Sequence, residues 1–296
     1  MKKTIFKGAA TALITPMNND GSVNYDGLKT LVDTQIDAGI DALVVCGTTG
    51  EKSTLNYKEH IDVVKAVVEY AHHRVPVIAG AGSNDTAYSV GICNEAMEVG
   101  ADALLMVTPY YNKTSQAGLV AHYNYVADRV DAPIIVYNVP SRTGVNILPE
   151  TYAELAKHPN IVAAKEANGD IASVVKTKYL CGDSLDIYSG NDDQIVPMLS
   201  VGGAGVISVL SNIAPADTHK MCAEYFAGNV EASRDLQIKY IQLINALFSD
   251  VNPIPVKEAM NIMGMGVGPC RLPLVPMADA KREALIAELK KVDLVK

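Results

Sequence analysis

The chain alternates short apolar runs with stretches in which apolar residues recur every three or four positions. The runs are too short for helices and end at polar or turn residues, which is typical of buried parallel strands. A spacing such as Leu28, Leu31 and Val32 instead predicts an amphipathic helix. Eight strands separated by helical segments are predicted, at residues 9–16, 41–46, 76–80, 102–107, 133–137, 161–166, 185–188 and 205–209.

Alternating strands and helices favour an α/β fold with a parallel sheet, and eight such units predict a closed (β/α)8 TIM barrel. A weak repeat supports this, because similar segments join a helix end to a strand start at residues 38–43, 99–104 and 201–206. A doubly wound sheet is the alternative, but no G-x-G-x-x-G pattern follows the first strand. From about Pro215 the pattern is helical only. We therefore expect a barrel at residues 1–228 and a C-terminal helical extension at residues 229–296.

Two helix starts can be placed from single residues. Asn84 follows the third strand and is a candidate N-cap for the next helix. Pro149 precedes the sixth strand and suits the first turn of a helix, where its missing N–H is not needed.

The composition limits the partners and the compartment. With a net charge of −8 and no Lys/Arg cluster, the chain is not expected to bind nucleic acid. No apolar run approaches the roughly 18 residues of a membrane span, and we expect a cytoplasmic protein. The five cysteines are scattered and odd in number, and the histidines show no metal-ligand spacing, so neither a disulfide framework nor a bound metal is expected.

The strand at residues 161–166, Ile-Val-Ala-Ala-Lys-Glu, has a lysine near its end. An amine in this position is poorly hydrated, and desolvation disfavours its charged form and lowers its pKa. A neutral amine is a nucleophile for carbonyl groups, so Lys165 is a candidate catalytic residue. A structural alternative stays open, in which the aliphatic stem packs and the ammonium reaches water or Glu166.

Catalytic groups of a (β/α)8 barrel lie at the C-terminal ends of its strands. Because side chains alternate along a strand, Ile135 shares a face with Tyr137. Ile161 and Ala163 are likewise expected on one face with Lys165. If both faces point inward, a phenol and an amine meet on adjacent strands. The strand ends of this chain carry Thr48, Thr49, Tyr111, Tyr137, Lys165 and residues 189–191.

Such a pair suits carbonyl chemistry through an imine. A lysine amine adds to a ketone, water leaves, and the protonated imine draws electrons from the neighbouring carbon to give an enamine. The hydroxyl groups of Tyr137 and Thr48 could relay the protons, and no cofactor is required. A phosphorylated substrate is not expected, because Gly202 and Gly203 precede the eighth strand instead of following it.

Five motifs occur in order along nearly the whole chain. They are Gly-Thr-Thr-Gly-Glu at 47–51, Pro-Tyr-Tyr at 109–111, Tyr-Asn-Val-Pro-Ser-Arg-Thr-Gly at 137–144, the lysine strand, and Asn-Pro-Ile-Pro-Val-Lys at 252–257. With these motifs the chain resembles the pyruvate-dependent class I aldolase superfamily, and within it the dihydrodipicolinate synthase family. Two details favour that family: the Gly-Thr-Thr-Gly-Glu loop, and Arg142, a cation that sialic-acid lyases lack at the matching place.

The resemblance implies catalytic roles for four residues. Lys165 would form a Schiff base with pyruvate. Tyr137, Thr48 and Tyr111 would relay protons, with Tyr111 supplied by a neighbouring subunit. The family is usually a homotetramer built from tight dimers, so the same assembly is expected here.

The resemblance also implies how the substrates are held. Thr49 would bind the carboxylate of pyruvate, and Arg142 would bind the carboxylate of aspartate semialdehyde, for which its rigid fork is suited. Gly190 and Ile207 would line the pocket through backbone groups. The implied reaction condenses these two small molecules in a committed step of lysine and diaminopimelate biosynthesis.

The family's lysine-inhibition site lies at the dimer interface. Where lysine-sensitive members have a histidine and a glutamate, this chain has Tyr57 and Tyr88, and Lys52 adds a positive charge. Loss of the carboxylate removes a partner for a cationic ligand, so weak or absent inhibition by lysine is expected. The positions that match this site include Lys52, Ser53, Tyr57, His60, Asn84, Tyr88 and Tyr110.

Two other functions remain compatible with the same fold. One is an aldolase or lyase that acts on N-acetylneuraminate or a keto-deoxy sugar acid. Arg142 is the discriminating residue, because a polyhydroxylated tail needs hydroxyl partners and not a carboxylate clamp. The other is a non-catalytic ligand-binding barrel, which needs no reactive amine.

Overall fold

The computed structural model describes residues 2–296, and Met1 lies outside the described residues. Its eight strands are β1 (Gly8–Ala12), β2 (Ala42–Val45), β3 (Val77–Gly80), β4 (Ala103–Val107), β5 (Ile134–Asn138), β6 (Ile161–Glu166), β7 (Asp186–Ser189) and β8 (Gly205–Ser208). They pair in parallel and in chain order, and β1 pairs with β8 to close the barrel. The predicted (β/α)8 fold is confirmed.

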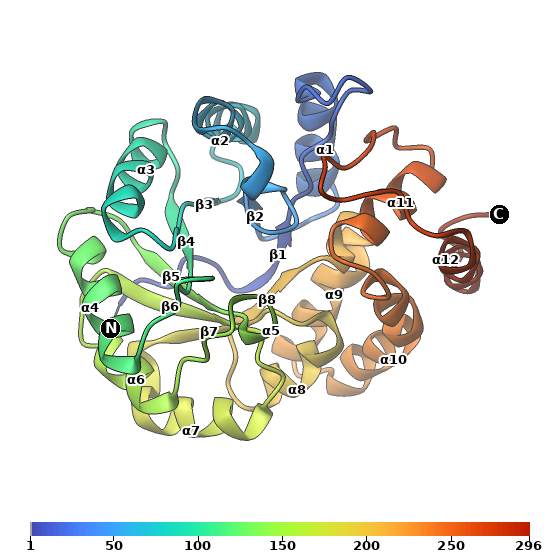
Figure 1. Cartoon of the computed structure of the whole chain (residues 1–296). Coiled ribbons are helices and arrows are strands. Elements are labelled where there is room, and N and C mark those ends of the chain that lie inside the picture. The colour runs from blue at the N-terminus through green and yellow to red at the C-terminus, as the bar shows by residue number, and fades with distance from the viewer. Residues whose placement is uncertain (1) are drawn as a thin grey trace.

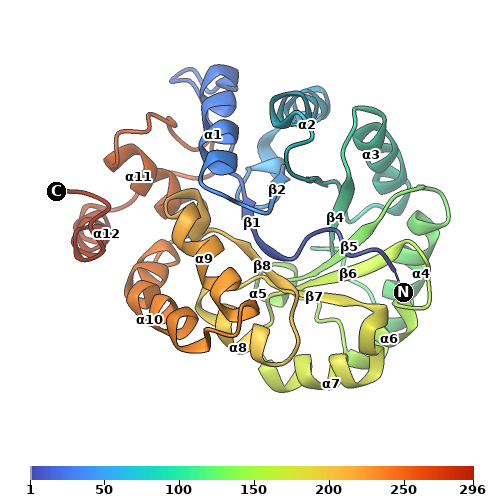
Figure 2. The ribbon, with the colours of Figure 1, turned by 180° about the vertical axis from the view of Figure 1, so that it is seen from behind.

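Helices surround the strands as a ring, which is visible from both sides (Figures 1 and 2). The ring consists of α1 (Tyr25–Asp37), α2 (Tyr57–Ala71), α3 (Thr86–Glu98), α4 (Gln116–Ala127), α6 (Pro149–Leu155), α7 (Ile171–Cys181), α8 (Ile195–Ser200) and α9 (Pro215–Phe226). Shorter turns of helix lie in the loops: η1 (Lys52–Thr54), α5 (Pro140–Thr143), η2 (Gly182–Ser184), η3 (Asp192–Gln194) and η4 (Leu210–Asn212).

One of the two predicted helix starts is correct. Pro149 occupies the first turn of α6, as predicted. The prediction that Asn84 caps α3 is wrong, because the carboxylate of Asp85 accepts the hydrogen bond from the Tyr88 N–H at 3.0 Å. Asp85 is one residue closer to the helix, and the side chain of Asn84 instead donates to the carbonyl oxygen of Tyr110.

Side chains on the strands divide into two layers. Outward-facing residues such as Leu43, Leu104 and Val136 belong to the larger core between strands and helices. Inward-facing residues fill the barrel, which is therefore a packed core and not a channel. The inner layer includes Ala10, Ala12, Ala42, Val44, Ile78, Ala103, Leu105, Ile135, Tyr137, Ala163, Tyr188 and Ile207.

The register between β5 and β6 shifts by one residue near the start of the pair. Strand β6 has one extra residue, Val162, which lies in the inner core, whereas Ile161 lies in the outer core. The prediction that Ile161 shares the inner face with Lys165 is therefore wrong. A bulge of one residue reverses the alternation of side chains on one side of it, and a simple alternating pattern does not reveal it.

After α9 the chain forms α10 (Val230–Leu247), α11 (Ile254–Ile262) and α12 (Asp279–Lys291). These three helices lie together beside α1 and α9 in both views (Figures 1 and 2). Strand β1 ends at Ala12, earlier than predicted, because the chain beyond it runs toward this region, where the Met17 N–H donates to the carbonyl of Val267. The division between residues 228 and 229 stays a prediction.

None of the helices among residues 2–296 combines the length and hydropathy needed to cross a membrane.

Candidate active site

Lys165 and Tyr137 lie side by side inside the barrel, near the C-terminal ends of β6 and β5. They are register partners, and the bulge lies before them, so both side chains are on the inner face. The amine Nζ of Lys165 is 4.3 Å from the centroid of the Tyr137 ring. Lys165 is 6% exposed. The predicted meeting of an amine and a phenol on adjacent strands is therefore present in the structure.

Burial lowers the pKa of Lys165 from 10.5 to about 8. The charge of Arg142 acts in the same direction, and the carboxylate of Asp192 acts against it. With a pKa of about 8, about a tenth of the amine is neutral at pH 7, roughly three hundred times more than for an unperturbed lysine. Part of the amine is thus neutral at ordinary pH, as desolvation of a strand-end lysine predicts, and a neutral amine is the form that can attack a carbonyl group.

Asp192, in η3, is a residue that the sequence analysis missed. It is buried, and its Oδ2 accepts hydrogen bonds from the backbone N–H groups of Val209 and Leu210, both at 2.9 Å. Its Oδ1 has no hydrogen-bond partner within residues 2–296. Burial raises the pKa of Asp192, and its charge favours the protonated form of Lys165. The sequence feature that could have pointed to Asp192 is its position directly after residues 189–191, at the C-terminal end of β7.

Three of the predicted catalytic and substrate-binding residues line one cavity of about 690 Å³, namely Thr48, Tyr137 and Arg142. Burial raises the pKa of Tyr137, while the Arg142 charge and the Thr48 side chain act in the opposite direction. The phenol therefore stays protonated and able to donate at neutral pH. Lys165 is not among the residues that line this cavity, but Tyr137 both lines the cavity and contacts the Lys165 amine.

Thr49 follows Thr48 in the loop after β2 and is buried. Asn252, from the C-terminal region, holds its side chain by a hydrogen bond. The side-chain Nδ2 of Asn252 donates to Thr49 Oγ1 at 2.9 Å. The carbonyl oxygen of Asn252 accepts a hydrogen bond from the Arg142 guanidinium at 3.3 Å. Asn252 therefore links the two predicted carboxylate binders. Because Thr49 Oγ1 accepts this bond, its own hydroxyl proton remains available for a ligand.

Gly190 and Ile207 do not line the 690 Å³ cavity, so their expected place in the pocket stays a prediction. Ile207 is buried on the inner face of β8. The Gly190 N–H donates to the carbonyl oxygen of Glu166 at 2.7 Å. A Cβ atom on Gly190 would lie 3.2 Å from Cε of Lys165 and 2.8 Å from Cβ of Ala167. A side chain at this position would therefore press directly on the amine-bearing residue.

Tyr111 is the predicted catalytic residue that does not join the others within one chain. Its backbone is left-handed, with φ of 67°, and its side chain is 92% exposed. The neighbouring Tyr110 lines the 690 Å³ cavity instead. Within a single chain, the ring of Tyr111 points away from Lys165 into the open.

Most of the predicted regulatory residues share the same cavity. Lys52, Ser53, His60, Tyr88 and Tyr110 line it. Lys52 donates to the carbonyl oxygen of Gly82, and burial lowers its pKa to about 8. Burial and the Lys52 charge lower the pKa of His60 to about 4, so this imidazole is neutral.

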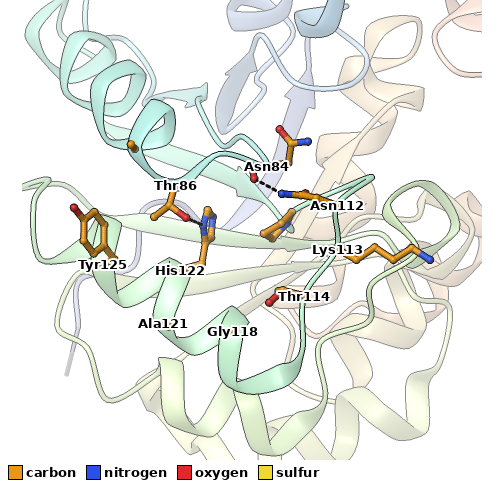
Figure 3. Close-up of a pocket in the computed structure, with 11 residues that line it drawn as sticks. Asn84, Thr86, Asn112, Lys113, Thr114, Gly118, Ala121, His122 and Tyr125 are labelled. Atoms are coloured by element: carbon orange, nitrogen blue, oxygen red, sulfur yellow. Dashed lines mark hydrogen bonds between the residues drawn. The ribbon is translucent and has the colours of Figure 1, made fainter.

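The two remaining regulatory positions lie next to this group. The ring of Tyr57 meets that of Tyr88 edge-on, with centroids 5.8 Å apart. Asn84 borders a second cavity of about 500 Å³ between α3, α4 and the loop after β4 (Figure 3). There Asn112 donates to the Asn84 carbonyl at 2.9 Å, and Thr86 pairs with His122 at 2.8 Å. The predicted catalytic residues do not line this second cavity.

Residues 2–296 contain no cluster of three histidine, cysteine, aspartate or glutamate side chains arranged to hold a metal ion. A closed (β/α)8 barrel with a desolvated lysine against a tyrosine at its strand ends defines a Schiff-base-forming lyase of the class I aldolase type. The chain belongs to the dihydrodipicolinate synthetase family, whose model matches residues 5–292.

Known relatives cover almost the whole chain. It is 56% identical over 281 residues to the 4-hydroxy-tetrahydrodipicolinate synthase of Caldicellulosiruptor saccharolyticus, which covers 95% of both chains. A dihydrodipicolinate synthase from Acinetobacter baumannii, solved in complex with pyruvate, is 41% identical with a TM-score of 0.96, covering 99% of this chain and 100% of the other. One from Cyanidioschyzon merolae, solved with lysine bound, is 36% identical with the same TM-score and coverage.

Proposed function

We propose that this protein condenses pyruvate with L-aspartate 4-semialdehyde, the activity of a 4-hydroxy-tetrahydrodipicolinate synthase. The observation that carries the proposal is the buried amine of Lys165, with a pKa of about 8, placed 4.3 Å from the centroid of the Tyr137 ring. The pyruvate complex of the Acinetobacter baumannii relative supports the choice of the first substrate.

The first stage forms an enamine on Lys165. The neutral amine adds to the keto carbon of pyruvate, and loss of water gives a protonated imine. Removal of a proton from the methyl carbon then gives the enamine. Tyr137 contacts the amine and lines the cavity together with Thr48, so we assign these hydroxyls to the proton relay. Thr49 would hold the pyruvate carboxylate through its available hydroxyl proton.

The second stage joins the two substrates. The enamine carbon attacks the aldehyde, and the amine of the added substrate then displaces Lys165 from the imine carbon and closes the ring. Arg142 would hold the carboxylate of the semialdehyde, because a guanidinium in the cavity wall offers paired donors to a planar anion. Gly190 and Ile207 would line the pocket near the amine through their backbone groups.

We also propose that the working form is a cytoplasmic homotetramer built from tight dimers, in which Tyr111 of one copy completes the proton relay of another. The near-complete exposure and left-handed backbone of Tyr111 support this, because an isolated chain gives its ring no partner site. Light scattering should report a mass above that of one chain. A fully active monomer would contradict this assignment.

Inhibition by lysine is proposed to be weak or absent. The predicted regulatory pocket already holds a cation, Lys52, which donates to Gly82. Tyr88 offers a phenol where a carboxylate partner for a cationic ligand would be needed. A relative from Cyanidioschyzon merolae was solved with lysine bound, and we propose that these side chains weaken lysine binding in the present chain.

The proposed reaction can be tested against cleavage of sugar acids. The purified protein would be incubated with pyruvate and aspartate semialdehyde, and separately with N-acetylneuraminate or a keto-deoxy sugar acid. We expect rapid condensation and negligible cleavage. Faster release of pyruvate from a sugar acid than consumption with the semialdehyde would contradict the proposed function.

A further inference from the structure

The C-terminal region holds a buried ion pair that the proposed mechanism does not use. Lys257, in α11, is 2% exposed, and its Nζ lies 2.7 Å from the carboxylate of Glu51. The same amine donates to the carbonyl oxygens of Thr15 and Pro269 at 3.0 and 2.7 Å, so its three hydrogens are all bonded. The other carboxylate oxygen of Glu51 accepts from the Arg271 N–H at 2.8 Å.

A buried ion pair of this kind needs an explanation other than stability. Desolvation of two charges offsets much of their attraction, and an apolar pair of similar volume is often as stable. Removing a single partner is costly, because it leaves the other charge buried and uncompensated. The pair is therefore better explained by what it positions than by what it contributes to the free energy of folding.

Glu51 ends the loop that carries Thr48 and Thr49. Its backbone is left-handed, with φ of 54°, a conformation that non-glycine residues keep only where their surroundings enforce it. The Glu51 N–H donates to the carbonyl oxygen of Thr48 at 3.1 Å. A fixed Glu51 therefore restrains the backbone of Thr48, one of the residues assigned to the proton relay.

The same region holds the loop at a second point. Asn252 precedes α11, and its side chain donates to Thr49 Oγ1 at 2.9 Å. The segment from Asn252 to Lys257 thus contacts the β2 loop on both sides of Gly50: Asn252 makes a hydrogen bond to Thr49, and Lys257 forms an ion pair with Glu51. We infer that the Glu51–Lys257 pair positions the Thr48–Thr49 loop for pyruvate, so that this part of the C-terminal region is a component of the active site. This inference rests on the proposed Schiff-base reaction.

The test measures imine formation, with Lys257→Met and the double variant Glu51→Gln/Lys257→Met. Each protein is reduced with borohydride over a series of pyruvate concentrations, and the fraction modified is measured by mass spectrometry. We expect both variants to need about tenfold more pyruvate for half-maximal trapping, a loss of about 1.4 kcal/mol. The KM for aspartate semialdehyde should change less than about twofold, since Arg142 keeps its own side chain and cavity.

Stability separates positioning from a structural role. The single variant should unfold more readily, because Glu51 is left without its counter-charge, and the double variant should recover stability without recovering pyruvate affinity. As a matched control, Arg282→Met breaks the 2.6 Å pair between Arg282 and Glu258. That pair joins α12 to α11 and does not contact the β2 loop, so trapping should stay normal.

A double-mutant cycle shows whether Lys257 acts through Thr49. Thr49→Val removes the hydroxyl and keeps the shape, and adding Lys257→Met to it should weaken pyruvate trapping no further. Fully additive effects, or a double variant Glu51→Gln/Lys257→Met that regains wild-type trapping, would overturn the inference. A wild-type protein that is never trapped by pyruvate would instead overturn the proposed function, and the inference with it.

Discussion

Two lysines of this chain have a pKa lowered to about 8 by burial, but their surroundings differ. Lys165 lies at the end of a barrel strand, where its amine faces the ring of Tyr137. Lys52 lies in η1, where its amine donates to the carbonyl oxygen of Gly82. Both amines are partly neutral near pH 8, so the pKa alone does not distinguish a nucleophilic lysine from an unreactive one.

The difference shows what else a reactive lysine needs. Lys165 lies against the phenol ring of Tyr137, to which we assign proton transfer, and Gly190 leaves space beside its Cε. The amine of Lys52 is committed to a backbone carbonyl, and its charge depresses the pKa of the nearby His60. We therefore propose that reactivity requires a proton relay and free space around a desolvated amine.

The largest expected effect comes from exchanging each lysine for alanine. Lys165→Ala should abolish imine formation with pyruvate and reduce turnover to background, because no other residue supplies the amine. Lys52→Ala should be trapped by borohydride like the wild type. Circular dichroism should show that both variants are folded. Near-normal turnover in Lys165→Ala would remove the basis for the comparison.

Removing the phenol tests the relay itself. Tyr137→Phe keeps the ring against Lys165 but deletes the hydroxyl, and loss of one positioned proton-transfer group typically costs about 10²–10⁴ in rate. We expect kcat to fall in this range while the fold and the pyruvate concentration for half-maximal trapping change little. A kcat within about twofold of the wild type would show that another group relays the proton.

Arg142→Ala should mainly damage the second half-reaction. Loss of a charge-assisted contact costs about 1.5–3 kcal/mol, or about 10- to 150-fold in kcat/KM for aspartate semialdehyde. Trapping by pyruvate alone should change much less, because Thr49 and Lys165 serve that step and loss of the Arg142 charge removes only one of the influences that lower the pKa of Lys165. If pyruvate trapping were impaired and the semialdehyde kinetics were not, the assignment of Arg142 would be wrong.

The pH dependence of imine formation reports the charge on Lys165. The rate should rise with pH with a midpoint at about 8 and then level off at higher pH, because the neutral amine is the nucleophile and its pKa is about 8. Asp192→Asn removes an anion that favours the ammonium, so the midpoint should move to lower pH. A midpoint that moves upward, or not at all, would show that Asp192 does not act on this amine.

The smallest expected effect is the response to added lysine. With Lys52 in the predicted regulatory pocket and phenols at Tyr57 and Tyr88, millimolar lysine should leave the rate of condensation nearly unchanged. Steady-state rates in a lysine titration measure this directly. Clear inhibition well below one millimolar would show that these side chains still accept the ligand.

Much of the fold and the central pair could be predicted from sequence, because short apolar runs and strand alternation carry that information. The bounds of the lysine strand, residues 161–166, are those of β6, and Tyr137 was predicted opposite Lys165. The alternation failed at Ile161, because a bulge depends on how two strands pair and not on either strand alone. Asn84 was misplaced as a cap, because two adjacent polar residues compete for that role.

Long-range partners were the other part that the sequence did not reveal. Asn252 reaches Thr49 across 203 positions, and Lys257 reaches Glu51 across 206. Asp192 was missed because its effect on Lys165 depends on burial and on the backbone amides that hold it. Such contacts are set by the packing of the C-terminal helices and of the strand ends, for which a single sequence offers no local pattern.

The most direct test is a peptide map after borohydride reduction in the presence of pyruvate. Both Lys165 and Lys52 have a pKa of about 8, so the map separates a lowered pKa from a complete reactive site. We predict one reduced pyruvate on the peptide that contains Lys165 and none on the peptide that contains Lys52. Modification of Lys52, or an unmodified Lys165, would contradict the account.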